Sequence, residues 1–382
     1  MTTRFLACTF AAFTTLALAA CTEGGTPGTA DGGDAGIPAS DAGASLLGFH
    51  ASNLDHSPQL EATLADATLG DIVLEDCGPQ IESSENGHVG CDGAVGEKYK
   101  QIDGFGGTQK YAVFVAKNIR IPADKIVAVG GDRPLILVAL ETITIDGAIE
   151  VSEGKVGAPV DSTTKDGTGP GGGIGLSNST GGAGGGGSFC GKGGMGGIAA
   201  AAGGASYGNA EIVPLQGGSN GGGYLGARGG GAIQLVAGRS IVLGRNAYIN
   251  AHGDGAVSGG GSGGAILLEA PTVHIEGSLT ANGGGGGAPG GASGTPGNRT
   301  SSPALGGRNT ENINGGDGSA GTAVNGTNGV LNPNPPNDGS GSGSGGGGAG
   351  WIRINTRSGA AEMSGLVSPA LGSTCATQGT LR

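Results

Sequence analysis

The chain has 382 residues, of which 90 are glycine, and it carries a formal net charge of −12, with 13% charged and 3% aromatic residues. A typical protein has about 7% glycine, and each glycine costs a helix interior about 1 kcal/mol relative to alanine, so this composition excludes a mainly helical fold. The glycines follow no strict Gly-X-Y period, which excludes collagen. The acidic balance argues against a nucleic-acid partner, because phosphate binding needs clustered Lys and Arg.

The N-terminus has the pattern of an export signal. Arg4 precedes an apolar run from Phe5 to Ala20 that is too short to span a bilayer as a stable helix, and Cys21 follows it. These features predict a signal peptide over residues 1–20. The stretch Leu18-Ala19-Ala20-Cys21 resembles the lipobox of bacterial lipoproteins. The alternatives are an ordinary signal peptide with a chance cysteine, or a buried apolar helix.

The lipobox resemblance implies cleavage before Cys21, acylation of that residue and a location in the bacterial cell envelope. Several acyl chains on one residue give durable anchoring, so we expect a membrane as a partner through the lipid anchor. In the enterobacterial sorting rule, Thr22 after the cysteine favours the outer membrane. Residues 21–47 continue with Gly, Ala, Asp, Ser, Thr and Pro, which predicts a flexible tether.

Residues 48–110 precede the first clear repeat and are predicted to form an N-terminal cap, because a solenoid end needs a cover. Four cysteines remain after the signal and the lipidation site: Cys77, Cys91, Cys190 and Cys375. An even count in an exported chain predicts two disulfides, for which three connectivities are open. We favour Cys77 with Cys91, which leaves Cys190 to tie a glycine-rich segment to Cys375 near the C-terminus.

An apolar phrase recurs five times within residues 111–382. Each copy has short runs with apolar residues at alternate positions, ended by Gly, Pro or Asp corners, which predicts strands. In the first strand of each copy, we expect these residues to face inward: Val113/Val115, Leu135/Leu137, Ile233/Leu235, Ile266/Leu268 and Ile352/Ile354. Leu135 follows Val113 by 22 residues. That length fits three strands and three turns.

These copies predict an all-β fold, a short parallel β-helix with coils of about 22 residues that resembles the pectate-lyase-like kind. Its core should be aliphatic and dry, and the outward faces of its sheets should be polar. An antiparallel sandwich of hairpins is the alternative. The same internal order in every copy favours the stacking of like strands on like.

Long glycine-rich insertions separate the later copies. The extra residues always enter after the third strand, at Gly154, Gly253 and Gly283, and the two longest stretches are 155–229 and 284–348. Equivalent corners of a solenoid lie on one side, so the insertions should emerge together as one lobe. The composition by itself favours disorder. The alternative is a bundle of extended polyglycine helices with three residues per turn, similar in composition to glycine-rich lobes of some phage adhesins and receptor ectodomains.

The sequence offers little catalytic chemistry. No nucleotide-binding glycine motif and no nucleophile elbow occurs, so we expect no cofactor. No C-x-x-C occurs and the five His are scattered, so we expect no metal site. A glycosidase needs two carboxyls about 5 to 9.5 Å apart, and the weak candidates are Asp146 and Glu276, which share one repeat position. The full set of acidic candidates is Asp132, Glu141, Asp146, Glu150, Glu153, Asp254, Glu269 and Glu276. Solvated turn positions explain these acids more simply.

The chain resembles a loose class of glycine-rich surface lipoproteins of Gram-negative bacteria with short β-helix-like repeats. The resemblance rests on Leu18–Cys21, the acidic tether and the phrase GGGSGGAILLEAP at 259–271. It implies a location and an architecture but no activity. We therefore expect a non-enzymatic, lipid-anchored envelope protein with a structural or adhesive role and a glycan or another cell-surface ligand. The alternatives are a β-helix polysaccharide lyase or hydrolase, and a passive envelope component without a specific ligand.

Overall fold

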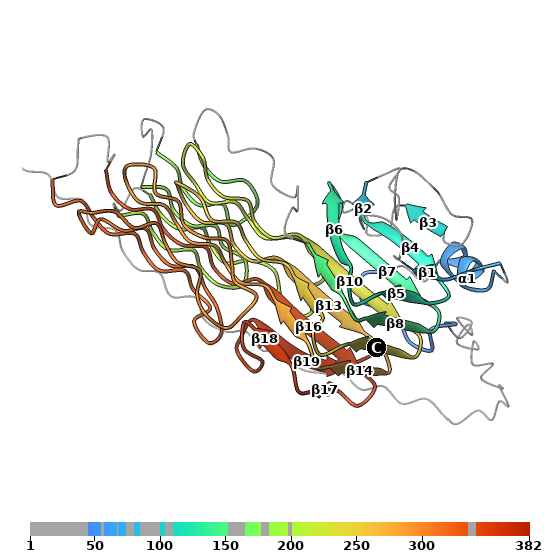
Figure 1. The fold of residues 1–382 in the computed structure, drawn as a ribbon. Coiled ribbons are helices and arrows are strands. Elements are labelled where there is room, and N and C mark those ends of the chain that lie inside the picture. Colours follow the sequence, from blue (N-terminus) through green and yellow to red (C-terminus); the bar gives the residue numbers. More distant parts are fainter. Residues whose placement is uncertain are drawn as a thin grey trace, which may run out of the picture. The chain divides into compact units, whose positions relative to one another are not determined.

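The computed structural model describes residues 45–54, 57–66, 68–73, 80–84, 100–103, 110–151, 165–176, 183–197, 201–334 and 341–382. Its strands form three sheets (Figure 1) in which every strand except one, in sheet C, pairs in parallel with its equivalent in the next coil, so the predicted parallel β-helix is confirmed. Sheet A consists of β1 (Ile72–Val73), β5 (Ile119–Ile121), β8 (Thr142–Ile145), β11 (Ser240–Leu243), β14 (Thr272–Ile275) and β17 (Glu362–Met363).

The other two sheets complete each coil. Sheet B consists of β2 (Gln80–Ser83), β6 (Ile126–Gly131), β9 (Ala148–Glu150), β12 (Tyr248–Asn250), β15 (Ser278–Thr280) and β18 (Leu366–Ser368). Sheet C consists of β3 (Lys100–Asp103), β4 (Ala112–Ala116), β7 (Leu135–Ala139), β10 (Ala232–Ala237), β13 (Ala265–Glu269), β16 (Trp351–Thr356) and β19 (Ala376–Thr380). Strand β3 pairs antiparallel with β4 and so covers one edge of sheet C.

The register of β4 corrects the expected inward positions of the first copy. Ala112 pairs with Leu135 and Phe114 with Leu137, and these side chains lie in the interior core. Val113 and Val115 face outward instead. All five residues of β4 are buried, so an apolar pattern cannot decide which face of this strand points inward. The coil length is accordingly 23 residues at this strand, counted from Ala112 to Leu135.

Four strands of sheet C are buried on both faces, which corrects the expectation of polar outward faces. The strands β4, β7, β10 and β13 are buried at every position. Their outward side chains pack in a second apolar cluster with Leu47, Phe49, Leu60, Leu64 and residues of the 189–215 region. By contrast β8 and β11 of sheet A alternate between buried and half-buried residues. A parallel sheet that is covered on both sides reads as a continuous apolar run.

A short helix supplies part of this cover. Helix α1 (Pro58–Leu64) begins with Pro58 in its first turn, and the hydroxyl of Ser57 accepts a hydrogen bond from the N–H of Leu60. Both features are typical of a helix start. Leu60 and Leu64 form its buried face and pack on the outward side chains of sheet C.

The glycine-rich insertions all leave the β-helix at one corner, as predicted. They connect β9 to β10, β12 to β13 and β15 to β16, and each therefore runs from sheet B to sheet C. In Figure 1, their chain continues as long extended segments that run side by side away from the strands and return at turns. The predicted lobe exists, and disorder is the wrong interpretation for its described residues.

Candidate functional site

The lobe is a bundle of extended segments arranged around a central one. Residues 343–350 are hydrogen-bonded through their backbone to six other segments: 184–188, 191–197, 258–263, 284–287, 314–319 and 324–330. Neighbours in this ring also bond to each other, as Gly186 does to Gly194 at 2.8 Å and Gly286 to Gly316 at 2.9 Å. This is the packing of polyglycine helices, so the second interpretation of the glycine-rich sequence is confirmed.

The hydrogen bonds follow a period of three residues. Gly345 and Gly348 donate to the carbonyl oxygens of Gly184 and Gly187, at 2.8 and 2.9 Å. Residues three apart thus meet the same neighbour, as expected for an extended helix with three residues per turn. Such a helix has no internal hydrogen bonds, so its backbone groups must pair with other segments.

Close packing explains the glycines of the central segment. A Cβ atom on Gly346, Gly347 or Gly348 would collide with the carbonyl oxygen of Asp317, Gly261 or Gly191, respectively. Three successive residues therefore each face a different segment, and none has room for a side chain. Serine side chains occupy a few buried positions in the lobe, where their hydroxyl groups accept hydrogen bonds from backbone N–H groups. The hydroxyl of Ser188, for example, accepts one from the N–H of Gly193 at 2.7 Å.

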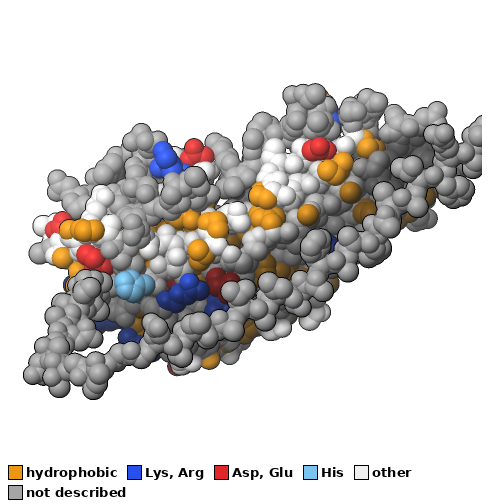
Figure 2. Space-filling model, turned by 180° about the vertical axis from the view of Figure 1, so that it is seen from behind, with side chains coloured by type: hydrophobic (Ala, Val, Ile, Leu, Met, Phe, Trp, Pro, Cys, Tyr) orange, Lys and Arg blue, Asp and Glu red, His pale blue; other side chains and the backbone are white. Residues whose placement is uncertain are grey.

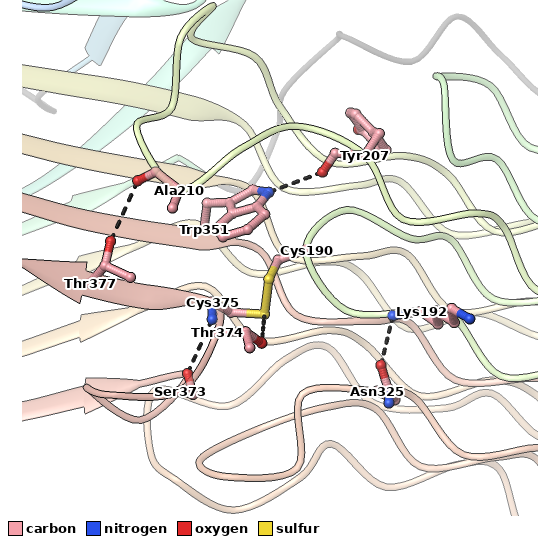
Figure 3. The surroundings of a disulfide bond; sticks show 10 residues. All are labelled: Cys190, Lys192, Tyr207, Ala210, Asn325, Trp351, Ser373, Thr374, Cys375 and Thr377. Atoms are coloured by element: carbon pink, nitrogen blue, oxygen red, sulfur yellow. Dashed lines mark hydrogen bonds between the residues drawn. A yellow bond between two sulfur atoms is a disulfide. The ribbon is translucent and has the colours of Figure 1, made fainter.

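The base of the lobe is fastened to the C-terminal strand by a disulfide (Figure 3). Cys190 and Cys375 are bonded, with a Cα–Cα distance of 5.6 Å, as the sequence predicted. Trp351 donates from Nε1 to the carbonyl oxygen of Tyr207 at 3.1 Å, and Thr377 donates from Oγ1 to that of Ala210 at 3.4 Å. Burial raises the pKa of Tyr207, although a hydrogen bond with Ser219 lowers it. The tyrosine is therefore a neutral structural residue.

The far end of the lobe presents large apolar side chains to solvent. Tyr224 and Leu225 lie in the turn where Gly226 bonds back to Gly223, and their exposed fractions are 55% and 57%. Other exposed apolar residues of the same end are Ile174, Met195, Val330 and Leu331. We call these six residues the tip residues. The lobe buries few side chains of this size, among them Phe189 at its base and Ile313, and these six side chains are not among the buried ones.

A polar cluster lies where the lobe joins sheet B. Asn250 on β12 donates to Glu150 on β9 at 2.8 Å and accepts from the hydroxyl of Thr280 on β15 at 2.7 Å. Arg299, from an insertion loop, lies 3.8 Å from Glu150 and stacks over the ring of Tyr248 at 4.5 Å. We call this group the junction cluster. It joins three successive coils to a loop of the lobe.

His252 is the titratable centre of the junction cluster. Its Nδ1 lies 3.9 Å from Glu150 and its Nε2 lies 3.9 Å from Asp254. Burial lowers the pKa of His252, the two carboxylates raise it, and Arg299 lowers it again. Burial is the largest cause, so the folded protein favours the neutral imidazole. The pairing of Asn250 Nδ2 with His252 Nδ1 fits that neutral form, because Nδ1 can accept a hydrogen bond.

The two catalytic candidates do not form a common site. Asp146 follows β8 and Glu276 follows β14, and Gly244 occupies the equivalent place in the coil between them. Two coil steps place the backbones of the two residues about 10 Å apart. Each has its own exposed partner: Arg120 lies 3.7 Å from Asp146, and Arg245 lies 3.6 Å from Glu276. An open depression of about 460 Å³ borders Glu276 but does not include Asp146.

One of the acidic candidates has a structural position that the sequence did not indicate. Glu269 at the end of β13 is 1% exposed and points to the outward side of sheet C. Its carboxylate accepts hydrogen bonds from the N–H and hydroxyl of Ser52, at 2.9 and 2.6 Å. Gln234 and Asn355 donate to it at 2.7 and 2.9 Å. A buried carboxylate needs such donors to compensate for lost hydration.

Several predicted residues lie outside the described ranges: Cys21, Cys77 and Cys91, together with the predicted signal peptide. Among the residues that are described, no three His, Cys, Asp or Glu side chains come together as a metal site would require. In the same part of the chain, no helix has the length and apolar character to cross a bilayer. Figure 2 shows the face opposite to that of Figure 1. The described part of this face has few charged side chains, and its hydrophobic side chains lie in small groups.

Comparison with known proteins gives no relative for this chain. No known family matches it, and neither a curated protein nor a solved structure is detectably similar.

Sequence reasoning missed the junction cluster and the tip residues. The sequence contains a weak sign of the cluster: the polar residues Glu150, Asn250 and Thr280 occupy the same place at the end of the third strand in three coils. The tip residues had a signal as well. Large apolar residues in glycine-rich stretches such as 217–230 interrupt a sequence that otherwise avoids them.

Proposed function

We propose that this protein is a lipid-anchored protein of the bacterial outer membrane whose lobe has an adhesive role at its tip. The anchor rests on the lipobox-like residues Leu18–Cys21. A glycan or another component of a cell surface is the proposed ligand. The β-helix serves as the support, and no catalytic step is assigned to it.

The observation that carries the proposal is the contrast between the lobe's interior and its tip. The bundle is held by backbone hydrogen bonds, and its central glycines leave no room for side chains. Six large apolar side chains are nevertheless exposed at its far end. Exposed apolar groups that fill no core are typical of interaction surfaces, and an aromatic ring such as that of Tyr224 is a common platform for sugars.

Binding to whole cells and to a glycan array tests the adhesive role. The variant combines Tyr224→Ser and Leu225→Ser, and a second variant combines Val330→Ser and Leu331→Ser. The matched control is Ile126→Ser, which removes an equally exposed apolar side chain (55%) from the β-helix. We expect either tip variant to lose binding by roughly tenfold or more, as for an interface anchor. Equal binding by the wild type and both tip variants would reject the proposal.

Cell fractionation tests the anchor separately. Cys21→Ser should move the protein from the membrane fraction to the soluble fraction, because it removes the acylated thiol and blocks lipoprotein processing. An unchanged distribution would show that the lipobox interpretation is wrong.

A further inference from the structure

We propose that two copies of this protein pair through strand β19, antiparallel and about a two-fold axis, so that sheet C continues from one copy into the other. The inference goes beyond the proposed adhesive role and depends neither on the lipid anchor nor on the tip residues. It rests on backbone groups of β19 that point away from the sheet, and on the match between these groups and the same groups of a second copy.

Strand β19 is an open edge of sheet C. It lies beyond β16, and no further strand follows it in the described part of the chain. Six of the described strands lie at sheet edges, and β19, with five residues, is the longest of them, whereas β17 and β18 have two and three. Proteins protect an edge with charged residues, a proline or a very short strand. The sequence of β19, ATQGT, has none of these protections.

The hydrogen bonds of β19 leave alternate residues without a backbone partner. The N–H of Leu381, just after the strand, donates to the carbonyl oxygen of Thr356 on β16 at 3.0 Å. Backbone groups alternate in direction along a strand, so the odd-numbered residues of β19 face β16 and the even-numbered ones face away. The N–H and carbonyl groups of Gln378 and Thr380 therefore point away from sheet C, and no residue that the structure describes is hydrogen-bonded to them.

The opposite edge of sheet C shows what kind of partner completes such an edge. There the antiparallel strand β3 pairs with β4. A second copy can complete the edge at β19 in the same way, because an antiparallel β19 presents the same groups in the reverse order. With Gly379 of one copy opposite Gly379 of the other, Gln378 lies opposite Thr380, and these two residues exchange both of their N–H···O bonds. The two-fold axis repeats the exchange, so four bonds use all the outward groups of both residues.

The residues of β19 suit this self-pairing. Gly379 lies on the two-fold axis, where the two residues directly opposite each other share no hydrogen bond and their backbones are closest. It has no side chain that could collide there. Each copy has a formal net charge of −12, but β19 is uncharged, so the pairing sets no like charges opposite each other along the strand. Because both copies use the same patch, the contact closes on itself and gives a dimer, not a fibre.

The dimer has a predictable arrangement of its lobes. The lobe segments enter sheet C at the amino ends of its strands, through Gly231, Gly264 and Gly350. Antiparallel pairing reverses the strand direction between the copies. The two lobes therefore start at opposite ends of the shared sheet, and neither obstructs the contact between the two β19 strands.

Sedimentation velocity of the full chain over a range of protein concentrations tests the dimer. The chain carries Cys21→Ser, so that no lipid contributes to self-association. A pair of five-residue strands is a small interface, so we expect a dimer with a dissociation constant in the micromolar range. Thr380→Pro removes one outward N–H from each copy, and with it two of the four bonds, but no bond to β16. It should weaken dimerisation by roughly tenfold or more. The matched control, Thr380→Val, keeps the N–H and should dimerise like the parent chain.

Hydrogen exchange in residues 376–382 locates the contact. Protection there should rise with protein concentration in the parent chain and in Thr380→Val, but not in Thr380→Pro. Unchanged exchange in the other strands of the proline variant would show that each copy is still folded. A parent chain that stays monomeric at every concentration would overturn the proposal. A dimer that Thr380→Pro leaves equally stable would overturn it as well, because the interface would then lie elsewhere.

Discussion

The β-helix and the lobe are two parts of one chain that are stabilised in opposite ways. The β-helix stacks aliphatic side chains, such as Ile149, Ile249 and Leu279, in a dry core. The lobe packs backbone against backbone, and its central glycines have other segments' carbonyl groups where side chains would be. One region needs large side chains at fixed positions, and the other needs their absence.

The lobe shows that backbone hydrogen bonds can order a segment when other segments surround it on every side. Residues 343–350 satisfy that condition through six neighbours. A glycine-rich chain loses more conformational entropy on folding than any other. The β-helix reduces this cost, because it holds the ends of all three insertions at one corner.

The largest effect is expected from adding one carbon atom to the central segment of the lobe. In Gly346→Ala, the new Cβ meets the carbonyl of Asp317, and no neighbour can move without losing its own hydrogen bonds. We expect a loss of stability of about 3 kcal/mol or more in the lobe, and faster hydrogen exchange across its segments. The measurement is exchange mass spectrometry on the intact protein.

Gly291→Asn is the matched control for that variant. Gly291 has a φ of +86° and nothing within 4 Å of an added Cβ. Asparagine tolerates the left-handed region, so the change should stay within about 0.5 kcal/mol. If both substitutions had equally small effects, close backbone packing would not explain the glycines.

The disulfide tests how far the two regions depend on each other. Cys190 and Cys375 are 185 residues apart in sequence, so their bond closes a long loop. Replacing both cysteines by alanine should cost about 2–5 kcal/mol and lower the melting temperature seen by calorimetry. Substitution is preferable to a reductant, because it would leave the predicted Cys77–Cys91 disulfide unchanged. An unchanged melting curve would mean that the lobe's base is held by its hydrogen bonds alone.

Removing one carbon from the β-helix gives the complementary, smaller effect. Ile249 is fully buried between Ile149 and Leu279. Ile249→Val leaves a cavity of one methylene and should cost about 0.5–1.5 kcal/mol by chemical denaturation. The exposed Ile126 is the control, where the same change should be near zero. A cost at Ile249 as large as that of Gly346→Ala would remove the contrast between the two regions.

The sequence predicted the β-helix well because its signal is periodic. Short alternating strands at matching places, such as Thr142–Ile145 and Ser240–Leu243, specify both the strands and their stacking. The inward face of β4 was predicted wrongly because Ala112 to Ala116 are apolar on both faces. The cover on sheet C was missed for the same reason, although continuous apolar runs such as LILVA are typical of strands buried on both sides.

The lobe could be located but its order could not be decided from composition. Polyglycine helices and disordered chains share the same residues, and the difference lies in whether six neighbours are present around a segment. That arrangement depends on contacts between segments far apart in sequence, such as Gly194 with Gly346. The candidate pair Asp146 and Glu276 shows what a repeat position leaves undetermined. A shared repeat position placed both on one corner, but it did not give the number of coils between them.

The smallest expected effect concerns pH at the junction of the two regions. Burial lowers the pKa of His252 in the folded protein, whereas in the unfolded chain it returns to about 6.5. The unfolded state therefore binds more protons below that pH, so His252 stabilises the fold fully above about pH 6.5 and less as the pH falls. Melting temperatures from pH 8 to pH 5 should decline more in the wild type than in His252→Gln, which keeps a polar side chain beside Glu150. A steeper decline in the variant would show that protonated His252 gains more from Glu150 and Asp254 than it loses by burial, and the junction would then tighten in acid.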